Sequence, residues 1–129
     1  MRSPKDMGVG IGYEGTSSSS SAADDELRKL VDDLRIQTTI MGCGGAGSNT
    51  VSRLAQVGVE DATLVAANSD ARHLLSISAP HRLILGKETT RGLGAGSMPQ
   101  VGRRAAEEAQ EEIRGLLQGR HIVFITAGL

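Results

Sequence analysis

The chain of 129 residues is long enough for one domain with a modest hydrophobic core. Its 14 basic and 15 acidic residues give a formal net charge of −1, so the charge balance does not favour a nucleic-acid partner. It also has only one Phe, one Tyr and no Trp, so it lacks the aromatic rings on which bases stack. A single cysteine excludes an internal disulfide. Because the sequence carries neither a signal-peptide core nor an apolar run near the ~18 residues of a membrane span, it predicts a cytoplasmic protein without such a span.

The first part of the chain predicts a tail followed by a helix. Residues 1–23 are expected to be a disordered Gly/Ser-rich tail, since repeated glycines and a serine run over 17–21 bury too little apolar surface to offset the entropy of ordering. A helix is predicted over 24–35, opened by Asp24 and Asp25, and its apolar stripe is expected to dock on the following domain. The stripe consists of Leu27, Leu30, Val31 and Leu34.

From residue 36 onward, apolar segments typical of buried parallel strands alternate with helical segments. The expected strands cover 36–41, 62–67, 82–85 and 122–126, and the expected helices cover 48–57, 70–76 and 99–118. This alternation predicts an α/β fold, a Rossmann-like parallel sheet with flanking helices and right-handed crossovers.

A first glycine loop (residues 42–49, Gly-Cys-Gly-Gly-Ala-Gly-Ser-Asn) lies between the first expected strand and a helix. It satisfies the G-x-G-x-x-G pattern, in which backbone N–H groups at a helix start hold a phosphate. A Walker A loop is excluded because no Lys-Ser or Lys-Thr follows the glycines. A Rossmann NAD(P)-binding oxidoreductase remains an alternative, although it requires an acid at the end of the second strand, where Asn68 stands.

A second glycine loop (residues 90–99, Thr-Arg-Gly-Leu-Gly-Ala-Gly-Ser-Met-Pro) follows the third expected strand, and a Rossmann half has no need of it. Between the two lies the Asn68 loop (residues 68–71, Asn-Ser-Asp-Ala). In this order the three motifs resemble the tubulin/FtsZ family of GTPases, and the first loop is similar to that of archaeal-type FtsZ. The resemblance covers about residues 36–128 and implies an incomplete GTP-binding domain over 36–129.

The resemblance implies GTP/GDP and Mg²⁺ as ligands, and it assigns roles to matched positions. In the first glycine loop the expected phosphate-binding N–H groups belong to Gly44, Gly45, Ala46 and Gly47. Asn49 matches the residue that contacts the guanine edge.

The remaining matched positions belong to the other two loops. Asn68 and Asp70 would lie near the phosphates, with Asp70 holding Mg²⁺ through a water. Gly94, Ala95 and Gly96 match the loop that senses the γ-phosphate. Arg91 could offset phosphate charge there, or could be a solvated loop arginine.

No catalytic residue is assigned within this chain. In the family, a Gly-Gly-Gly-Thr-Gly-Thr-Gly loop should follow the strand at 122–126, and a second domain supplies catalytic acids in trans. This chain is therefore expected to be an N-terminal part that neither hydrolyses GTP nor polymerises alone. The resemblance implies that the intact protein is a cell-division GTPase forming head-to-tail filaments at the division site, with membrane-anchor proteins as partners. A non-catalytic filament scaffold is the second alternative.

Four residues with reactive side chains are expected to have no catalytic or metal-binding role. Cys43 lies in the first glycine loop without a paired base, so we expect a small turn residue rather than a nucleophile. His73, His81 and His121 share no metal-ligand spacing, so the sequence favours no metal site built from them.

Overall fold

The structure is a computed structural model that describes residues 17–129, with side chains from residue 21 onward. It divides into two compact units, Met1–Arg35 and Ile36–Leu129. In the first unit, helix α2 (Ser17–Leu34) begins earlier than the predicted start at Asp24. Ala22 and Ala23 precede that start, and alanine is the residue most favourable to a helix, so the helix extends through them. Most of the predicted tail, residues 1–16, lies outside the described residues, and the docking of the helix stays a prediction.

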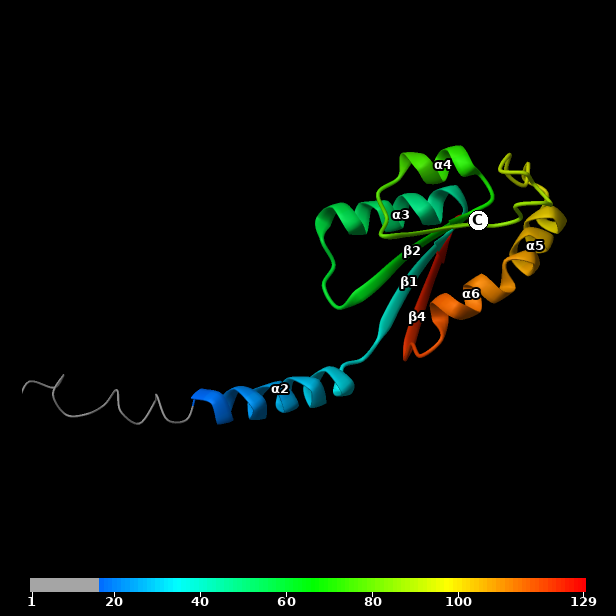
Figure 1. The fold of residues 1–129 in the computed structure, drawn as a ribbon. Helices are drawn as coiled ribbons and strands as arrows, with labels where there is room; N and C mark the ends of the chain where they lie inside the picture. The colour runs from blue at the N-terminus through cyan, green and yellow to red at the C-terminus, as the bar shows by residue number, and fades with distance from the viewer. Residues whose placement is uncertain (1–16) are drawn as a thin grey trace, which may run out of the picture. The chain divides into compact units, whose positions relative to one another are not determined.

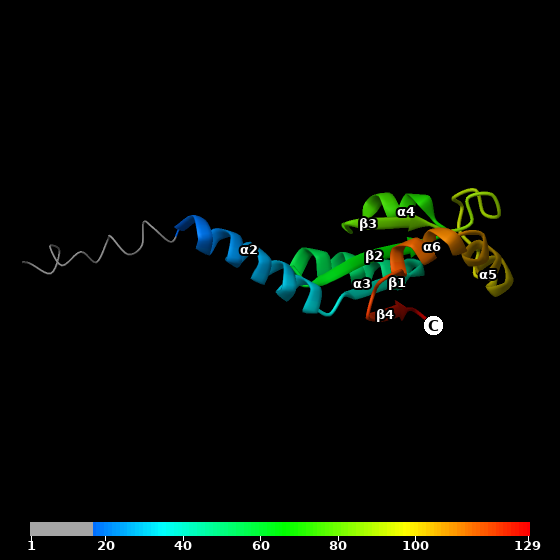
Figure 2. The same cartoon turned by 60° about the horizontal axis from the view of Figure 1, so that its bottom comes forward.

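The second unit contains a parallel sheet of four strands. Strands β1 (Thr38–Cys43), β2 (Ala62–Asn68), β3 (His81–Ile84) and β4 (Ile122–Ala127) lie in the order β3-β2-β1-β4. Every neighbouring pair is parallel. Figure 2 shows β3 and β4 at opposite edges, with β1 and β2 between them. The predicted α/β class with a Rossmann-like parallel sheet is confirmed.

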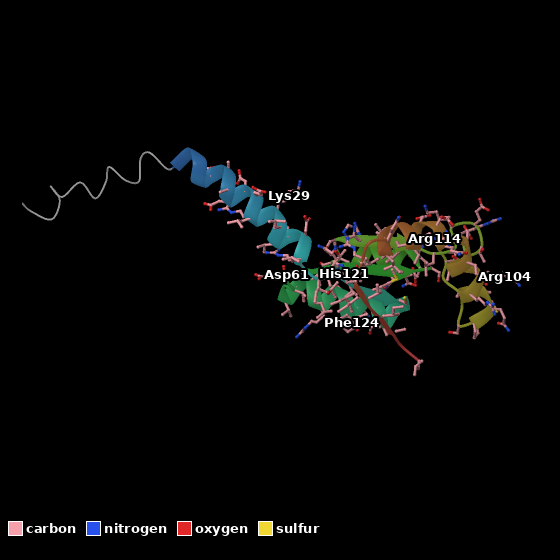
Figure 3. The ribbon with its side chains drawn as sticks, turned by 90° about the horizontal axis from the view of Figure 1, so that it is seen from below. Lys29, Asp61, Arg104, Arg114, His121 and Phe124 are labelled. Atoms are coloured by element: carbon pink, nitrogen blue, oxygen red, sulfur yellow. The ribbon has the colours of Figure 1, made fainter. Side chains whose placement is uncertain are left out.

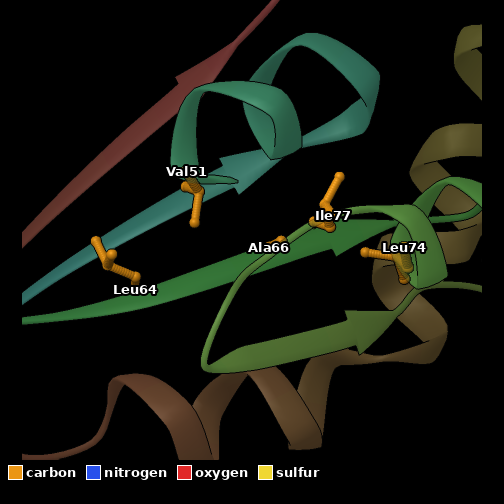
Figure 4. Close-up of a cluster of buried hydrophobic side chains, with 5 residues drawn as sticks. All are labelled: Val51, Leu64, Ala66, Leu74 and Ile77. Atoms are coloured by element: carbon orange, nitrogen blue, oxygen red, sulfur yellow. The ribbon is translucent and has the colours of Figure 1, made fainter. Parts of the chain in front are cut away.

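Helices cover both faces of this sheet (Figure 1). Helices α3 (Gly44–Val57) and α4 (Ala71–Ser76) lie on one face. Their shared apolar cluster is drawn in Figure 4 and consists of Val51, Leu64, Ala66, Leu74 and Ile77. The opposite face carries a second cluster, with Met41, Val65, Ala67 and Leu83 packed against the α6 side chains Ile113, Leu116 and Leu117. Burial on both faces explains why β2 is apolar along nearly its whole length.

The single helix predicted over 99–118 is wrong, because the segment forms two helices. Helix α5 (Pro99–Glu108) ends at Ala109, where φ is −92° and ψ is 10°, and α6 (Gln110–Leu117) follows. The apolar residues Val101, Ala105, Ala109 and Ile113 of this segment repeat every four residues. At 3.6 residues per turn, three such steps rotate the apolar stripe by about 120° around a straight helix. The break at the buried Ala109 returns Ile113 to the sheet.

Strand β4 confirms the fourth predicted strand but is covered much less than the others. It pairs with β1 along its whole length. Its side chains are nonetheless largely exposed, and Phe124, labelled in Figure 3, is 57% exposed. Among the described residues, the packed clusters centre on β1, β2 and β3.

Candidate nucleotide-binding site

The two glycine loops and the Asn68 loop lie at the same edge of the sheet. They follow β1, β3 and β2 respectively, and parallel strands place their carboxyl ends together. The backbone joins the second glycine loop to the Asn68 loop directly, because Ala71 N–H donates to Gly92 O at 3.0 Å. The topology therefore brings the three motifs to one edge of the sheet.

The first glycine loop forms the opening turn of α3. Strand β1 ends at Cys43 and the helix begins at Gly44, so the predicted helix start at Ser48 is too late. Cys43 is the N-cap and makes no side-chain capping hydrogen bond. The first N–H groups of a helix have no partner within it and carry the positive end of its dipole. The N–H groups of residues 44–47 are thus placed to donate to an anionic ligand.

The glycines of this loop differ in what requires them. A Cβ on Gly42 would collide with the carbonyl oxygen of Gly47, and a Cβ on Gly47 would collide with that of Thr126, so both allow α3 to approach the sheet. Gly44 has a φ of +71°, which favours glycine. Gly45 has neither constraint, since its φ is ordinary and a Cβ there would meet nothing within 4 Å beyond its own helical turn. Packing and backbone geometry therefore leave Gly45 unexplained.

Cys43 lies half-buried beside these glycines. Burial raises the pKa of its thiol, which reduces the thiolate that a nucleophile requires. This direction supports the expectation that Cys43 is a small turn residue.

The Asn68 loop is held by its own side chains. Asn68 is 7% exposed, and its Oδ1 accepts a hydrogen bond from Asp70 N–H at 3.2 Å. Asp70 is the N-cap of α4, and its Oδ1 accepts from His73 N–H at 3.1 Å. Both predicted site residues are therefore held by hydrogen bonds within this part of the chain.

His73 joins the Asn68 loop to the first glycine loop, a role that the sequence analysis missed. Its Nδ1 lies 3.1 Å from Nδ2 of Asn68, and its Nε2 lies 3.0 Å from Oδ1 of Asn49. The available signal was its place three residues after the capping Asp70, because a capping aspartate fixes the backbone of that position. Ligand spacing alone could not reveal a histidine that bonds two amides.

The second glycine loop is tied to the Asn68 loop. Gly94 N–H donates to Ser69 O at 3.1 Å. The buried Thr90 hydroxyl lies 3.0 Å from Gly86 O and 3.3 Å from Ser69 O, and both carbonyl oxygens can accept from it. These bonds place Gly94, and with it Ala95 and Gly96, beside the Asn68 loop.

Left-handed backbone is concentrated in this second loop. Gly92, Gly94 and Gly96 have φ values of 79°, 86° and 59°. Two residues with side chains also adopt it, Arg91 at 53° and Ser97 at 59°. Such conformations cost about 1 kcal/mol or more for non-glycine residues and often mark functional loops. Arg91 and Gly96 are exposed, whereas Gly94 and Ala95 are half-buried.

Glu108 of α5 holds the segment that leads into this loop. Its carboxylate accepts hydrogen bonds from Glu88 N–H at 2.9 Å, Thr89 N–H at 3.1 Å and the Thr89 hydroxyl at 2.7 Å. The Glu88 backbone bond, followed by the Thr89 hydroxyl, lowers the pKa of Glu108. This contact joins residues about 20 positions apart in the chain, and the sequence analysis does not predict it.

The family model for the Tubulin/FtsZ family, GTPase domain, matches residues 37–129. The chain belongs to the tubulin/FtsZ family. This finding rules out the alternative of a Rossmann oxidoreductase. The match covers the sheet, both glycine loops and the Asn68 loop, so the resemblance inferred from three motifs holds across the second unit.

Individual tubulin/FtsZ relatives agree with the family match. The chain is 46% identical over 129 residues to a cell division protein FtsZ of Haloferax mediterranei, covering 97% of this chain and 34% of the relative. It is 48% identical over 109 residues to cell division protein FtsZ 1 of Thermococcus kodakarensis, covering 84% and 29% respectively. The chain therefore spans about a third of the length of these archaeal relatives.

Solved tubulin/FtsZ structures share the fold. An FtsZ mutant from M. jannaschii is similar with a TM-score of 0.76 and 44% identity, covering 84% of this chain and 32% of that one. An empty FtsZ dimer from M. jannaschii gives a TM-score of 0.75 and 45% identity, covering 83% and 31%.

Across residues 17–129, no group of three or more His, Cys, Asp and Glu side chains could hold a metal ion. None of the helices in that range is both long and apolar enough to cross a membrane.

Proposed function

We propose that this chain binds GTP and GDP at the edge formed by its three loops. The observation that carries the proposal is Gly45, a glycine with open space around it on a helix start that has no side-chain cap. A ligand phosphate approaching the backbone gives Gly45 a reason to lack a Cβ. The N–H groups of Gly44, Gly45, Ala46 and Gly47 would hold the α- and β-phosphates, and Asn49 would contact the guanine.

The other two loops would bind the distal phosphates and Mg²⁺. Asp70 uses Oδ1 to cap α4, which leaves its other carboxylate oxygen to bind Mg²⁺ through a water. One carboxylate suffices, because Mg²⁺ on nucleotides takes most of its ligands from phosphate and water. Asn68 would lie beside the phosphates. Gly94, Ala95 and Gly96 would close on the γ-phosphate, and Arg91 would offset charge from an exposed position.

We further propose that this chain acts as part of a cell-division GTPase. Family membership and archaeal FtsZ relatives support a protein that hydrolyses GTP and assembles head to tail into filaments in the cytoplasm at the division site. The M. jannaschii dimer supports contact between copies. Division-site membrane-anchor proteins would then be its partners.

Nucleotide titration of the purified chain tests the binding proposal. GDP and GTP should bind saturably in isothermal calorimetry, ADP should bind more weakly, and NAD should not displace GDP. Chelation of Mg²⁺ should weaken GTP more than GDP, because the ion offsets charge on the distal phosphates. Equal affinity for GDP and ADP, or displacement of GDP by NAD, would contradict the proposal.

A further inference from the structure

We infer that His73 is a positioning residue that fixes the orientation of the Asn49 side-chain amide toward the base. The inference rests on the proposed function, because it concerns how the proposed guanine contact is presented. His73 contacts Asn49 and is not itself assigned a contact with the nucleotide.

Hydrogen-bond direction can be followed from the backbone to Asn49. Asn68 Oδ1 accepts from Asp70 N–H, which can only donate, so the Nδ2 group of Asn68 must be the donor toward His73. His73 Nδ1 must therefore accept, and the proton of the neutral ring lies on Nε2. That Nε2–H donates to Oδ1 of Asn49 across 3.0 Å. A backbone N–H of the Asn68 loop thus decides which end of the Asn49 amide is the oxygen.

The histidine can impose this orientation because its own position is fixed. The backbone N–H of His73 donates to Asp70 Oδ1 at 3.1 Å, and the ring Nδ1 accepts from Nδ2 of the largely buried Asn68. Asn49, in contrast, is exposed on α3. An exposed amide without such a partner rotates and exchanges its two ends, and ordering it on binding lowers affinity. His73 removes that freedom before the nucleotide arrives.

The fixed amide has a definite preference for the base. With Oδ1 engaged by His73, Asn49 offers its NH₂ group, so it favours a base edge that carries an acceptor. Guanine presents a carbonyl oxygen at position 6, where adenine presents an amino group. A released amide could reverse and accept from that amino group. His73 is therefore expected to raise the preference for guanine over adenine nucleotides.

Three variants separate this role from general folding. His73→Leu removes both ring nitrogens, and we expect it to reduce the GDP-over-ADP preference about tenfold, the value of one hydrogen bond of about 1.4 kcal/mol. His73→Gln retains one acceptor and one donor at similar spacing and should restore most of the preference. His81→Leu, an exposed histidine on β3, is the matched control and should leave the preference unchanged.

Nitrogen-15 NMR of the imidazole rings tests the hydrogen-bond chain without any nucleotide. We expect the His73 ring to be the Nε2–H tautomer in the wild-type chain. An Nδ1–H tautomer overturns the inference. So does a His73→Leu variant that loses GDP and ADP affinity equally, or a His73→Gln variant that restores nothing. A wild-type chain without guanine preference overturns the proposed function as well, whereas a preference that survives in His73→Leu overturns the role of His73 alone.

Discussion

Replacing two glycines of the first loop with alanine separates the requirement of the ligand from the requirement of the fold. Gly45 and Gly47 lie in the same turn of α3, two residues apart. A methyl group on Gly45 enters open space, whereas one on Gly47 meets the carbonyl oxygen of Thr126 and lies 2.9 Å from the carbonyl carbon of Gly42. The same chemical change should therefore have opposite effects on stability.

The expected magnitudes follow from those surroundings. Gly45→Ala should stabilise the chain by about 0.5–1 kcal/mol, because alanine loses less conformational entropy in a helix. It should also weaken GDP binding about ten- to a hundredfold, since displacing one N–H bond to a charged phosphate costs about 1.5–3 kcal/mol. Gly47→Ala must push α3 away from the backbone of β1 and β4, and overpacking of this kind costs about 1–3 kcal/mol or more.

Urea denaturation and GDP titration of both variants check these values. Gly45→Ala should raise the urea midpoint and lower GDP affinity, and Gly47→Ala should lower the midpoint. A Gly45→Ala variant that binds GDP like the wild type would refute the argument that this glycine exists for the ligand. Loss of stability in Gly45→Ala equal to that in Gly47→Ala would show that the open space at residue 45 has been misjudged.

Three further predictions concern other parts of the unit. Thr39 is fully buried, and its hydroxyl has no hydrogen-bond partner among the described residues. Thr39→Val should therefore raise the free energy of unfolding by about 1 kcal/mol, seen as a higher urea midpoint, without changing GDP affinity; a lower midpoint would contradict this. The pKa of Glu108 is lowered in the folded chain, so its ionised carboxylate stabilises the fold above the ordinary carboxyl pKa. That stabilisation is lost as the pH falls through the lower folded pKa. Between about pH 6 and 3, the melting temperature of the wild-type chain should therefore fall more than that of Glu108→Gln. Parallel pH curves would remove that assignment. Gly96→Val should weaken the binding of GTP more than that of GDP in calorimetry. Gly119→Val introduces the same left-handed strain in open space outside the loops, so it is the control and should change the binding of neither nucleotide. Equal losses of GTP and GDP affinity in Gly96→Val would exclude a γ-phosphate contact.

Much of the fold could be predicted because the deciding forces act along the chain. Apolar segments of strand length predicted all four strands within a few residues. The signal is strongest for β2, because a parallel strand covered on both faces is apolar along its length. Parallel order then placed the motifs at one edge, as the hydrogen bond from Gly94 to Ser69 confirms. The proposed roles of the site residues in binding remain predictions.

Other features depend on distances that the sequence does not contain. The break at Ala109 brings Ile113 of α6 onto the sheet, and no helix breaker marks it in the sequence. Four glycines in the first loop look alike in sequence, yet Gly42 and Gly47 serve packing and Gly44 serves backbone geometry. Sequence pattern therefore overstates how much of a glycine motif concerns the ligand.

The position of His73 shows how a site can be set by contacts outside its recognisable motifs. The N–H groups of the glycine loops can bind any phosphate, so those groups do not distinguish one nucleotide from another. Discrimination of a base needs a donor and an acceptor that cannot exchange places, and an exposed asparagine does not meet that condition by itself. The hydrogen bonds from Asp70 through Asn68 and His73 to Asn49 transfer the fixed direction of a backbone N–H to that amide. Base preference in this chain should accordingly depend on a residue three positions beyond the Asp70 cap of α4 as much as on the first glycine loop itself.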